Sequence, residues 1–318
     1  MQNIPSVDLH DFLSDNPERK QKFINEIGNA YEEIGFVALK GHFLDEALVN
    51  DLYNEVKNFF ILPLEVKEQY EVPGIGGQRG YVSFGKEKAK GHTQGDLKEF
   101  WHFGQYLAED SIYKGHPHYH DNVSVNELAN FNKTGEQAYK MLEKTGVYVL
   151  RALAIYLGLN EFYFDDYVNE GNSILRPIHY PPITNEPKDA VRAAAHGDIN
   201  LITLLMGAQG RGLQVQNHEG EWIDAIAEPD ELVINVGDML SRHTNNKLKS
   251  TIHRVVNPSR ELWGSSRYSI PFFMHPVAEM KLNCLENCVN KQHPKLYDDI
   301  TAGDFLYERL VELGLIKK

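Results

Sequence analysis

The sequence predicts a mainly β protein with α-helices, in which a sandwich or barrel core is flanked by N-terminal helices and a C-terminal helix. Between Ile174 and about Cys284, apolar and β-branched runs recur at roughly 8–12-residue spacing with turn residues between them, as in sandwiches and barrels. Residues 125–158 and two earlier stretches instead repeat apolar residues at helical spacing. The 318 residues can bury a large core in one elaborate domain or two.

The first 120 residues are expected to begin with a short strand at 6–9, followed by a helix. Apolar residues between 23 and 34 fall at helical spacing and give that helix one apolar face. Gly35 ends the helix, and the run F-V-A-L-K at 36–40 predicts the next strand.

A second helix is expected from Asp45, a residue type that caps helix N-termini, to residue 60. Seven glycines then lie between residues 74 and 95. Glycine has more backbone freedom than other residues, so such a loop becomes ordered only when new contacts offset its entropy. We expect this loop to be a lid that closes over bound substrate, and an ordinary surface loop is the alternative.

The remaining elements complete a division into four stretches. A long amphipathic helix at 125–158 ends at Gly158, and a last helix at 303–315 is expected to pack back on the sheets. The four stretches are an N-terminal helical and strand region (1–120), a long connecting helix (121–170), a β-rich catalytic core (171–284) and a C-terminal helical segment (285–318).

Composition and charge narrow the classes of partner. The formal net charge is −13, the pI is about 5.5, and no basic tract interleaves with aromatic residues, so nucleic acid is not an expected partner. No run of about 18 apolar residues is present, and the N-terminus lacks a basic start followed by an apolar stretch. We therefore expect no membrane span and no secretion signal, and we predict a cytoplasmic protein. Cys284 and Cys288 are then a reduced pair rather than a disulfide or a zinc site.

The most informative motif is the triplet H-G-D at 196–198. An H-x-D triplet alone is common, but this one directly precedes the apolar run 199–206, which we expect to be a buried strand. Residues two apart on an extended chain face the same way, so His196 and Asp198 can both point at one ion. His253 lies in another strand-like run and can supply a third ligand. Two imidazoles and one carboxylate are the ligand set of a non-haem Fe(II) site with open positions, which would activate dioxygen.

Arg267 and Ser269 follow on the run R-Y-S-I-P-F-F, where they face the same side of an expected strand. The planar fork of a guanidinium matches a carboxylate, so Arg267 can hold an organic acid that binds beside the metal.

The ordered set of motifs resembles the Fe(II)/2-oxoglutarate-dependent dioxygenases, and more narrowly their isopenicillin N synthase-like branch. The resemblance covers nearly the whole chain. Besides H-G-D, H-R-V-V-N-P and R-Y-S, it includes I-P-S-V-D-L (4–9), E-I-G-F-V-A-L-K-G-H (33–42), N-F-F-I-L-P-L-E-V-K (58–67), L-R-P-I-H-Y-P-P (175–182), G-L-Q-V-Q (212–216) and N-V-G-D-M-L (235–240). Each string is common, whereas their order is specific.

The resemblance implies a double-stranded β-helix, or jelly roll, as the catalytic core. Members of the family convert 2-oxoglutarate and dioxygen to succinate and CO2 while they oxidise a small molecule, and hydroxylation is the reaction that we expect here. Ascorbate is a candidate reductant. One departure concerns Ile178, which stands where the family pattern has asparagine. The implied roles are Fe(II) binding by His196, Asp198 and His253, and binding of the distal carboxylate of 2-oxoglutarate by Arg267, Ser269 and Tyr180.

Two other functions stay open at this point. In isopenicillin N synthase, the equivalent arginine and serine hold a substrate carboxylate, so a co-substrate-free non-haem iron oxidase is one alternative. A catalytically silent small-molecule binding or sensing protein is the other, although the complete ligand triad argues against it. Fe(II)-dependent succinate formation would separate the three. Desaturation and ring closure use the same iron site as hydroxylation, and the sequence predicts neither a particular substrate nor an oligomeric state.

The substrate side is expected near the segments 78–84 and 96–103, with further candidates later in the chain. An arginine there can pair with a substrate carboxylate, and aromatic side chains can form an apolar wall. The alternative for Arg79 is a solvated loop position, and for Trp101 and Phe103 it is a place in the core. The full set of candidates is Arg79, Tyr81, Phe84, Trp101, Phe103, Arg242 and Phe273.

Other histidines are not expected to bind metal. The string H-P-H-Y-H at 116–120 resembles a metal site, but its proline and the absence of a strand pattern predict an exposed loop. His179, His243 and His275 belong to no motif, and we expect structural roles for them.

Overall fold

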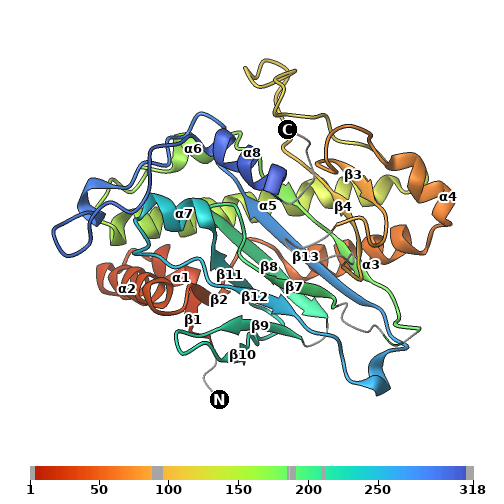
Figure 1. The fold of residues 1–318 in the computed structure, drawn as a ribbon, viewed down its shortest axis with the longest axis horizontal. Helices are drawn as coiled ribbons and strands as arrows, with labels where there is room; N and C mark the ends of the chain where they lie inside the picture. Colours follow the sequence, from red (N-terminus) through yellow and green to blue (C-terminus); the bar gives the residue numbers. More distant parts are fainter. Residues whose placement is uncertain (1–3, 88–95, 185, 187–190, 210–211, 313–318) are drawn as a thin grey trace.

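The computed structural model describes residues 4–87, 96–184, 186, 191–209 and 212–312, and two β-sheets form its centre (Figure 1). Nearly all the strand pairs are antiparallel, and the one parallel pair joins β1 to β2. The larger sheet runs β1 (Ser6–Asp8), β2 (Phe36–Lys40), β11 (Leu232–Val236), β8 (Ile202–Gln209), β13 (Arg267–Met274), β6 (Ile178–Tyr180), β4 (Glu99–His102) and β3 (Gly80–Val82), with β5 (Ile174–Leu175) also paired to β13. The smaller sheet runs β10 (Trp222–Asp224), β9 (Leu213–Gln216), β12 (His253–Val255) and β7 (Ala193–His196).

The two sheets enclose an apolar layer of their own. Phe36, Ala38 and Val233 of the larger sheet pack in one cluster with Val215 of the smaller sheet. This arrangement is the double-stranded β-helix that the sequence analysis expected, with helices around a mainly β core. A rigid β framework of this kind fixes the position of inward-facing side chains more tightly than loops do.

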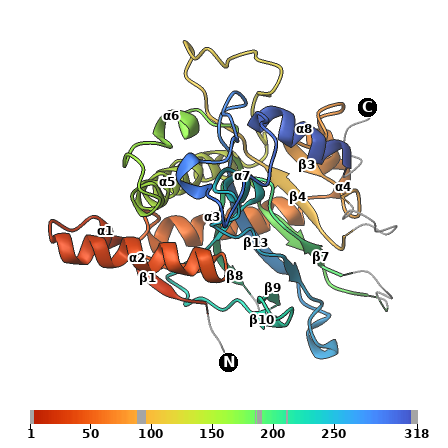
Figure 2. The same cartoon turned by 60° about the vertical axis from the view of Figure 1, so that its left-hand side comes forward.

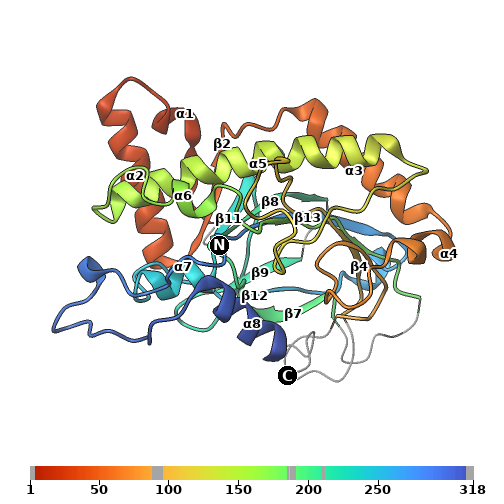
Figure 3. The same cartoon turned by 90° about the horizontal axis from the view of Figure 1, so that it is seen from above.

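Helices cover the outer face of the larger sheet. α5 packs against β13, β8 and β5, and α2 and α3 pack against α5 (Figure 3). α8 lies near β3 and β4 at another side of the sheets (Figure 2). Residues of all three elements line one cavity. The helices are α1 (Leu9–Phe12), α2 (Pro17–Glu33), α3 (Glu46–Ile61), α4 (Leu64–Lys67), α5 (Ala129–Tyr156), α6 (Asp165–Val168), α7 (Asp238–His243) and α8 (Ala302–Glu312), with short 3-10 turns at Glu68–Tyr70, Arg260–Leu262 and Glu286–Cys288.

Local sequence explains where the expected helices begin and end. The side chain of Asp45 accepts a hydrogen bond from the backbone N–H of Leu48 at 2.7 Å, which confirms the expected N-cap of α3. Gly35, just beyond α2, has a φ of +73°, and a Cβ there would lie 2.1 Å from the carbonyl oxygen of Lys249. Only glycine suits that position, so the helix ends where the sequence predicts.

Three expected boundaries differ from those observed. β8 begins at Ile202 rather than at residue 199, because the side chain of Asn200 bonds Ile202 O and Thr203 Oγ1 and holds the chain in a bend. α5 starts at Ala129 rather than at residue 125. α8 spans Ala302–Glu312, and the last part of the expected helix at 303–315 lies outside the described residues.

Two further expectations concern cysteines and membranes. Cys284 and Cys288 are both free thiols, as expected. None of the helices in the described part of the chain is both long enough and apolar enough to cross a bilayer.

Candidate metal and co-substrate site

Two imidazoles and a carboxylate meet where the two sheets approach each other. His196 ends β7, His253 begins β12, and the two residues are direct partners in the antiparallel β12–β7 ladder. Asp198 lies in the bend between β7 and β8. Its Oδ1 atom is 3.9 Å from Nε2 of His196 and 3.7 Å from Nε2 of His253. The three expected metal ligands are therefore brought together.

Backbone carbonyls orient both imidazoles. Nδ1 of His196 lies 2.7 Å from the carbonyl oxygen of Ala194, and Nδ1 of His253 lies 3.2 Å from that of Thr251. A carbonyl oxygen can only accept, so each Nδ1 carries the proton and each Nε2 presents its lone pair beside Asp198. Metal binding needs this tautomer, and the backbone supplies it before any ion arrives.

Asp198 is held in a similar way. Its Oδ2 atom accepts hydrogen bonds from Thr203 Oγ1 at 2.6 Å and from Asn235 Nδ2 at 2.8 Å, so Oδ1 faces the imidazoles. Burial raises the pKa of Asp198, but the neighbouring His253 and His196 and the two hydrogen bonds outweigh burial and hold its pKa below the ordinary value. The carboxylate is therefore ionised and ready to bind a cation.

The electrostatics of the imidazoles also suit a metal. Burial and the neighbouring His253 ring lower the pKa of His196 to about 4, which keeps that ring neutral near pH 7. The ligand atoms of the triad lie within 4.8 Å of one another, and it is the one such group of three that the described residues form. Two histidines and one carboxylate with open positions fit Fe(II).

The expected co-substrate residues lie on β13 and β6. Arg267 pairs with Tyr180 in the β13–β6 register, and its guanidinium carbon lies 5.0 Å from the centroid of the tyrosine ring. Arg267 is only 3% exposed, yet its Nε and Nη1 atoms have no hydrogen-bond partner among the described residues. A buried guanidinium with unused donors fits the carboxylate of an organic acid. Ser269, also buried, is the ladder partner of Ile178, whose side chain has no hydrogen-bonding group.

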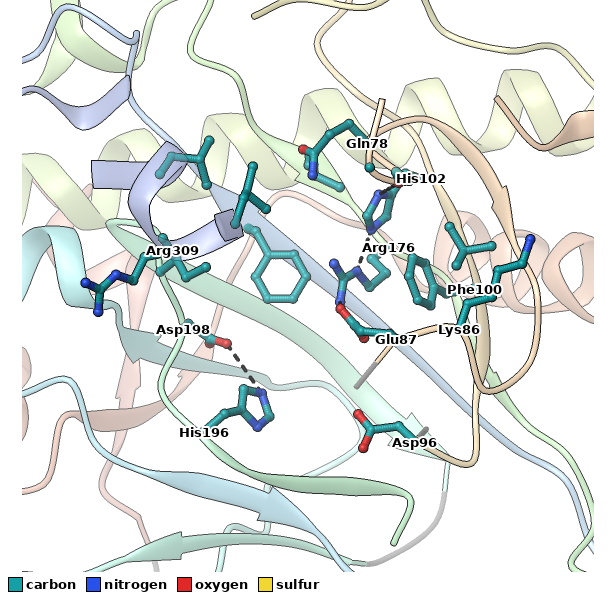
Figure 4. Close-up of a pocket in the computed structure, with 18 of the residues that line it drawn as sticks. Gln78, Lys86, Glu87, Asp96, Phe100, His102, Arg176, His196, Asp198 and Arg309 are labelled. Carbon is teal, nitrogen blue, oxygen red and sulfur yellow. Dashed lines mark hydrogen bonds and ion pairs between the residues drawn. The ribbon is translucent and has the colours of Figure 1, made fainter. Parts of the chain in front are cut away.

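A cavity of about 710 Å³ opens beside His196 and Asp198 (Figure 4). Its wall combines apolar and polar side chains from both sheets, from the glycine-rich stretch and from α8. Gly76, Gly77 and Glu87 bring the described part of the expected lid to the cavity, whereas residues 88–95 lie outside the described residues. Closure of that loop stays a prediction.

Arg176 also lies in the cavity wall, although no sequence motif pointed to it. Its guanidinium carbon is 4.5 Å from the ring centroid of Phe100 and 5.0 Å from that of Phe273. Figure 4 shows it between His102 and Glu87. Nδ1 of His102 donates to Gly77 O at 2.7 Å, so its Nε2 accepts from Nε of Arg176. The guanidinium is thus fixed before a substrate enters.

The cations on the described part of the cavity wall are each paired with a carboxylate. Burial raises the pKa of Glu87, but Lys98 and Arg176 outweigh it and hold that pKa well below its usual range. Among the described residues, the cations on the wall form these ion pairs: Lys86 with Glu71 at 2.5 Å, Lys98 with Glu87 at 2.7 Å and with Asp96 at 2.8 Å, Arg176 with Glu87 at 3.3 Å, and Arg309 with Glu312 at 3.0 Å.

The seven expected substrate residues divide into two groups. Tyr81 and Phe273 line the cavity. Phe84 is 50% exposed and lies outside the cavity wall, and Trp101 and Phe103 are buried in the aromatic core around Phe131. That core position was the alternative weighed for Trp101 and Phe103.

The two expected substrate arginines are engaged elsewhere. Arg79 is buried and donates to His120 O, Gln78 O and Asn172 Oδ1, so it fixes loops rather than lining the cavity. Arg242 donates to the carbonyl oxygen of Asp298 and also lies outside the cavity wall. All of these contacts except the one to Gln78 involve residues distant in sequence, so no local pattern reveals them.

The other histidines lie in varied surroundings outside the metal triad. The loop at 116–120 contains no strand, and its histidines do not form a three-ligand group with other described residues. His179 bonds Glu99 and Ser266, and His243 bonds the hydroxyl of Tyr163. His275 differs from the expectation, because it lines the cavity that also contains Asp198.

Comparison with known proteins agrees with this geometry. The family model described as non-haem dioxygenase in morphine synthesis N-terminal matches residues 4–127, and that of the 2OG-Fe(II) oxygenase superfamily matches residues 171–276. The 2-oxoglutarate-Fe(II) type oxidoreductase hxnY of Emericella nidulans is 30% identical, over 95% of this chain and 88% of that protein.

Solved structures share the fold over the full length. A 2OG-Fe(II) oxygenase family protein from Caulobacter crescentus has a TM-score of 0.88 and 43% identity, covering 98% of this chain and 99% of the other. A full-length Neurospora crassa protein, solved in complex with alpha-KG and thymine, has a TM-score of 0.84 and 30% identity, covering 97% of this chain and 96% of the other.

Proposed function

Because this chain belongs to the 2OG-Fe(II) oxygenase superfamily, we propose that it hydroxylates a small organic molecule in the cavity beside His196 and Asp198. The protein is an Fe(II)- and 2-oxoglutarate-dependent dioxygenase, and these groups supply the activation of dioxygen when they are bound. The observation that carries the proposal is the oriented metal triad, two of whose ligands, His196 and Asp198, line a cavity large enough for a small molecule.

The protein's own residues then have distinct tasks. His196, Asp198 and His253 hold the metal through Nε2, Oδ1 and Nε2, the atoms that backbone and side-chain hydrogen bonds leave available. Arg267 and Ser269 bind the distal carboxylate of 2-oxoglutarate, and Tyr180 adds its hydroxyl. This assignment is supported by the register of β13 and β6, which places Arg267 beside Tyr180.

On the substrate side, Arg176 is the central contact in our proposal, with Tyr81 and Phe273 in the adjacent wall. A guanidinium fixed by His102 and Glu87 is suited to donate to a carbonyl or similar acceptor. Each cation that the described residues place on the wall is paired with a carboxylate, so none is left to attract an anionic substrate. We therefore expect a neutral, compact molecule with a hydrogen-bond acceptor and an apolar face.

A turnover screen tests this proposal. Purified protein, Fe(II), ascorbate and 2-oxoglutarate are incubated with nucleobases, amino acids, small peptides and phenolic acids, and succinate release is measured. Nucleobases are included because the similar Neurospora crassa structure holds thymine. The true substrate should raise succinate release well above the substrate-free rate and yield a product one oxygen atom heavier by mass spectrometry. A product of unchanged oxygen content would contradict hydroxylation.

A further inference from the structure

A second buried arginine lies close to Arg267. Arg192 directly precedes β7, the strand that ends at His196, and it is 4% exposed. Its guanidinium carbon lies 5.7 Å from the centroid of the Tyr180 ring, and that of Arg267 lies 5.0 Å from the same centroid. The smaller and the larger sheet thus each bring one guanidinium to the same tyrosine.

Neither guanidinium has its donors fully used. Nε of Arg192, like Nε and Nη1 of Arg267, is buried without a hydrogen-bond partner among the described residues. The one side-chain hydrogen bond of Arg192 to a described residue runs from Nη2 to Ser265 O, at 3.4 Å. No carboxylate oxygen of the described residues lies within 4.0 Å of a guanidinium nitrogen of either arginine, which is the distance of an ion pair. Burial of an unpaired cation is costly, so two buried guanidinium groups whose donors the described residues leave unused point to an anionic ligand.

The charges around Arg192 agree with that reading. Burial, followed by the positive charge of Arg267, lowers the pKa of Arg192, and Tyr180 is the remaining titratable group that acts on it. Two guanidinium groups therefore repel each other in a largely dry site. An anion bound near both would remove that repulsion and use the free N–H donors.

We propose that Arg192 and Arg267 form a two-arginine site for the distal carboxylate of 2-oxoglutarate, with Tyr180 beside both. This inference rests on the assignment of Arg267 to that carboxylate. Arg192 is a positioning and specificity residue in this account. Its charge favours a 2-oxo acid with a second carboxylate over one that lacks it.

Calorimetric binding tests the proposal without turnover. The protein is loaded with Mn(II) and titrated with 2-oxoglutarate and with 2-oxopentanoate, which lacks the distal carboxylate. Arg192→Met should weaken 2-oxoglutarate binding about 10- to 100-fold, because a buried charge loses one of its partners. The same variant should leave the weak binding of 2-oxopentanoate unchanged. Arg192→Lys, which keeps the charge, should recover most of the lost affinity and serves as the second variant if Arg192→Met does not fold.

Two further variants serve as controls for this experiment. Arg254→Met is the matched control, because Arg254 follows a metal ligand in sequence but bonds Gln214 and lies 4.0 Å from the Trp222 ring centroid. It should bind both acids like the wild type. Arg267→Met must weaken 2-oxoglutarate binding in the same assay. If it does not, Arg267 is not part of the co-substrate site and the proposal falls with it. Suppose that Arg267→Met weakens 2-oxoglutarate binding as expected. The role of Arg192 is then overturned, and that of Arg267 kept, if Arg192→Met binds 2-oxoglutarate like the wild type. The same conclusion follows if Arg192→Met binds 2-oxoglutarate and 2-oxopentanoate more weakly by the same factor.

Discussion

His253 and His196 face each other as partners of the β12–β7 ladder, and their ring centroids lie 4.5 Å apart. Strand pairing therefore fixes the distance between two of the three metal ligands. Asp198 completes the triad from a bend, and it depends on side-chain hydrogen bonds instead. The precision of the site thus has two sources, a ladder for the imidazoles and a small polar cluster for the carboxylate.

The first prediction concerns that polar cluster. Asn235→Ala removes one of the two donors to Oδ2 of Asp198, so the carboxylate is less firmly oriented. We expect metal affinity to fall about 10- to 100-fold, as is typical when a group that orients a metal ligand is lost. Calorimetric titration with Mn(II) measures this change. Gln214→Ala, on the smaller sheet and bonded to Asp224, should keep wild-type affinity. An Asn235→Ala variant that binds metal normally would contradict the role given to Asn235.

The second prediction concerns Arg267. Arg267→Leu should raise the Michaelis constant for 2-oxoglutarate by the equivalent of about 2–5 kcal/mol, because a charge-assisted contact is lost. Steady-state succinate assays over a range of 2-oxoglutarate concentrations measure it. Arg254→Leu is the control for loss of a positive charge near the site. Normal 2-oxoglutarate dependence in Arg267→Leu would remove this residue from the co-substrate site.

The third prediction concerns Arg176. Arg176→Met keeps an apolar side chain between Phe100 and Phe273 but removes the donors. Loss of a hydrogen bond to a charged group costs about 1.5–3 kcal/mol, so kcat/KM for the substrate found by the screen should fall roughly 10- to 100-fold.

The affinity for 2-oxoglutarate should not change in Arg176→Met, which separates this role from that of Arg267. The exposed Arg260, paired with Glu186 at 2.9 Å, provides the control variant Arg260→Met. If Arg176→Met weakens 2-oxoglutarate and substrate equally, Arg176 does not act on the substrate side.

The metal triad and the core strands could be predicted because their signals are local. His196 and Asp198 are two residues apart and precede an apolar run, and Arg267 and Ser269 alternate on one strand. Side chains alternate between the two faces of a strand, and extending this alternation along the same runs would have identified two further cavity residues. Arg176 lies four positions before Tyr180, and His275 lies two after Phe273. The face of a strand on which a residue lies therefore predicts cavity residues that the motifs alone do not.

Other contacts could not be predicted because their causes are long-range. Trp101 packs on Phe131, and Arg79 bonds Asn172, a residue far along the chain. An aromatic residue or an arginine near a glycine-rich segment looks the same in sequence whether it lines a cavity or fills the core. The start of β8 was misplaced for a different reason, since the side-chain hydrogen bonds of Asn200 interrupt an apolar run.

The fourth prediction concerns pH and the metal-free protein. His243 is 3% exposed, and burial lowers its pKa from 6.5 to about 4. His243 therefore becomes protonated below pH 6.5 in the unfolded chain but only near pH 4 in the folded protein. Its contribution to the free energy of unfolding is fully present above pH 6.5 and is lost as the pH falls. Between pH 7.5 and 5 this residue should account for about 2 kcal/mol of the loss in unfolding free energy.

Urea unfolding of the metal-free protein at the two pH values measures this effect. His243→Gln, which keeps an acceptor for the hydroxyl of Tyr163, should lose about 2 kcal/mol less than the wild type between them. His218→Gln, at a histidine whose side chain is 72% exposed, should lose as much as the wild type. Equal losses in wild type and His243→Gln would contradict the burial argument.

Succinate formed from 2-oxoglutarate is the most direct test of the central claim. Wild-type protein with Fe(II) and the substrate found by the screen should release succinate in step with product, and withdrawal of either Fe(II) or 2-oxoglutarate should stop both. Asp198→Ala should release none while unfolding cooperatively like the wild type, because it lacks one metal ligand. Substrate oxidation that continues without 2-oxoglutarate would contradict the account and identify a co-substrate-free iron oxidase instead.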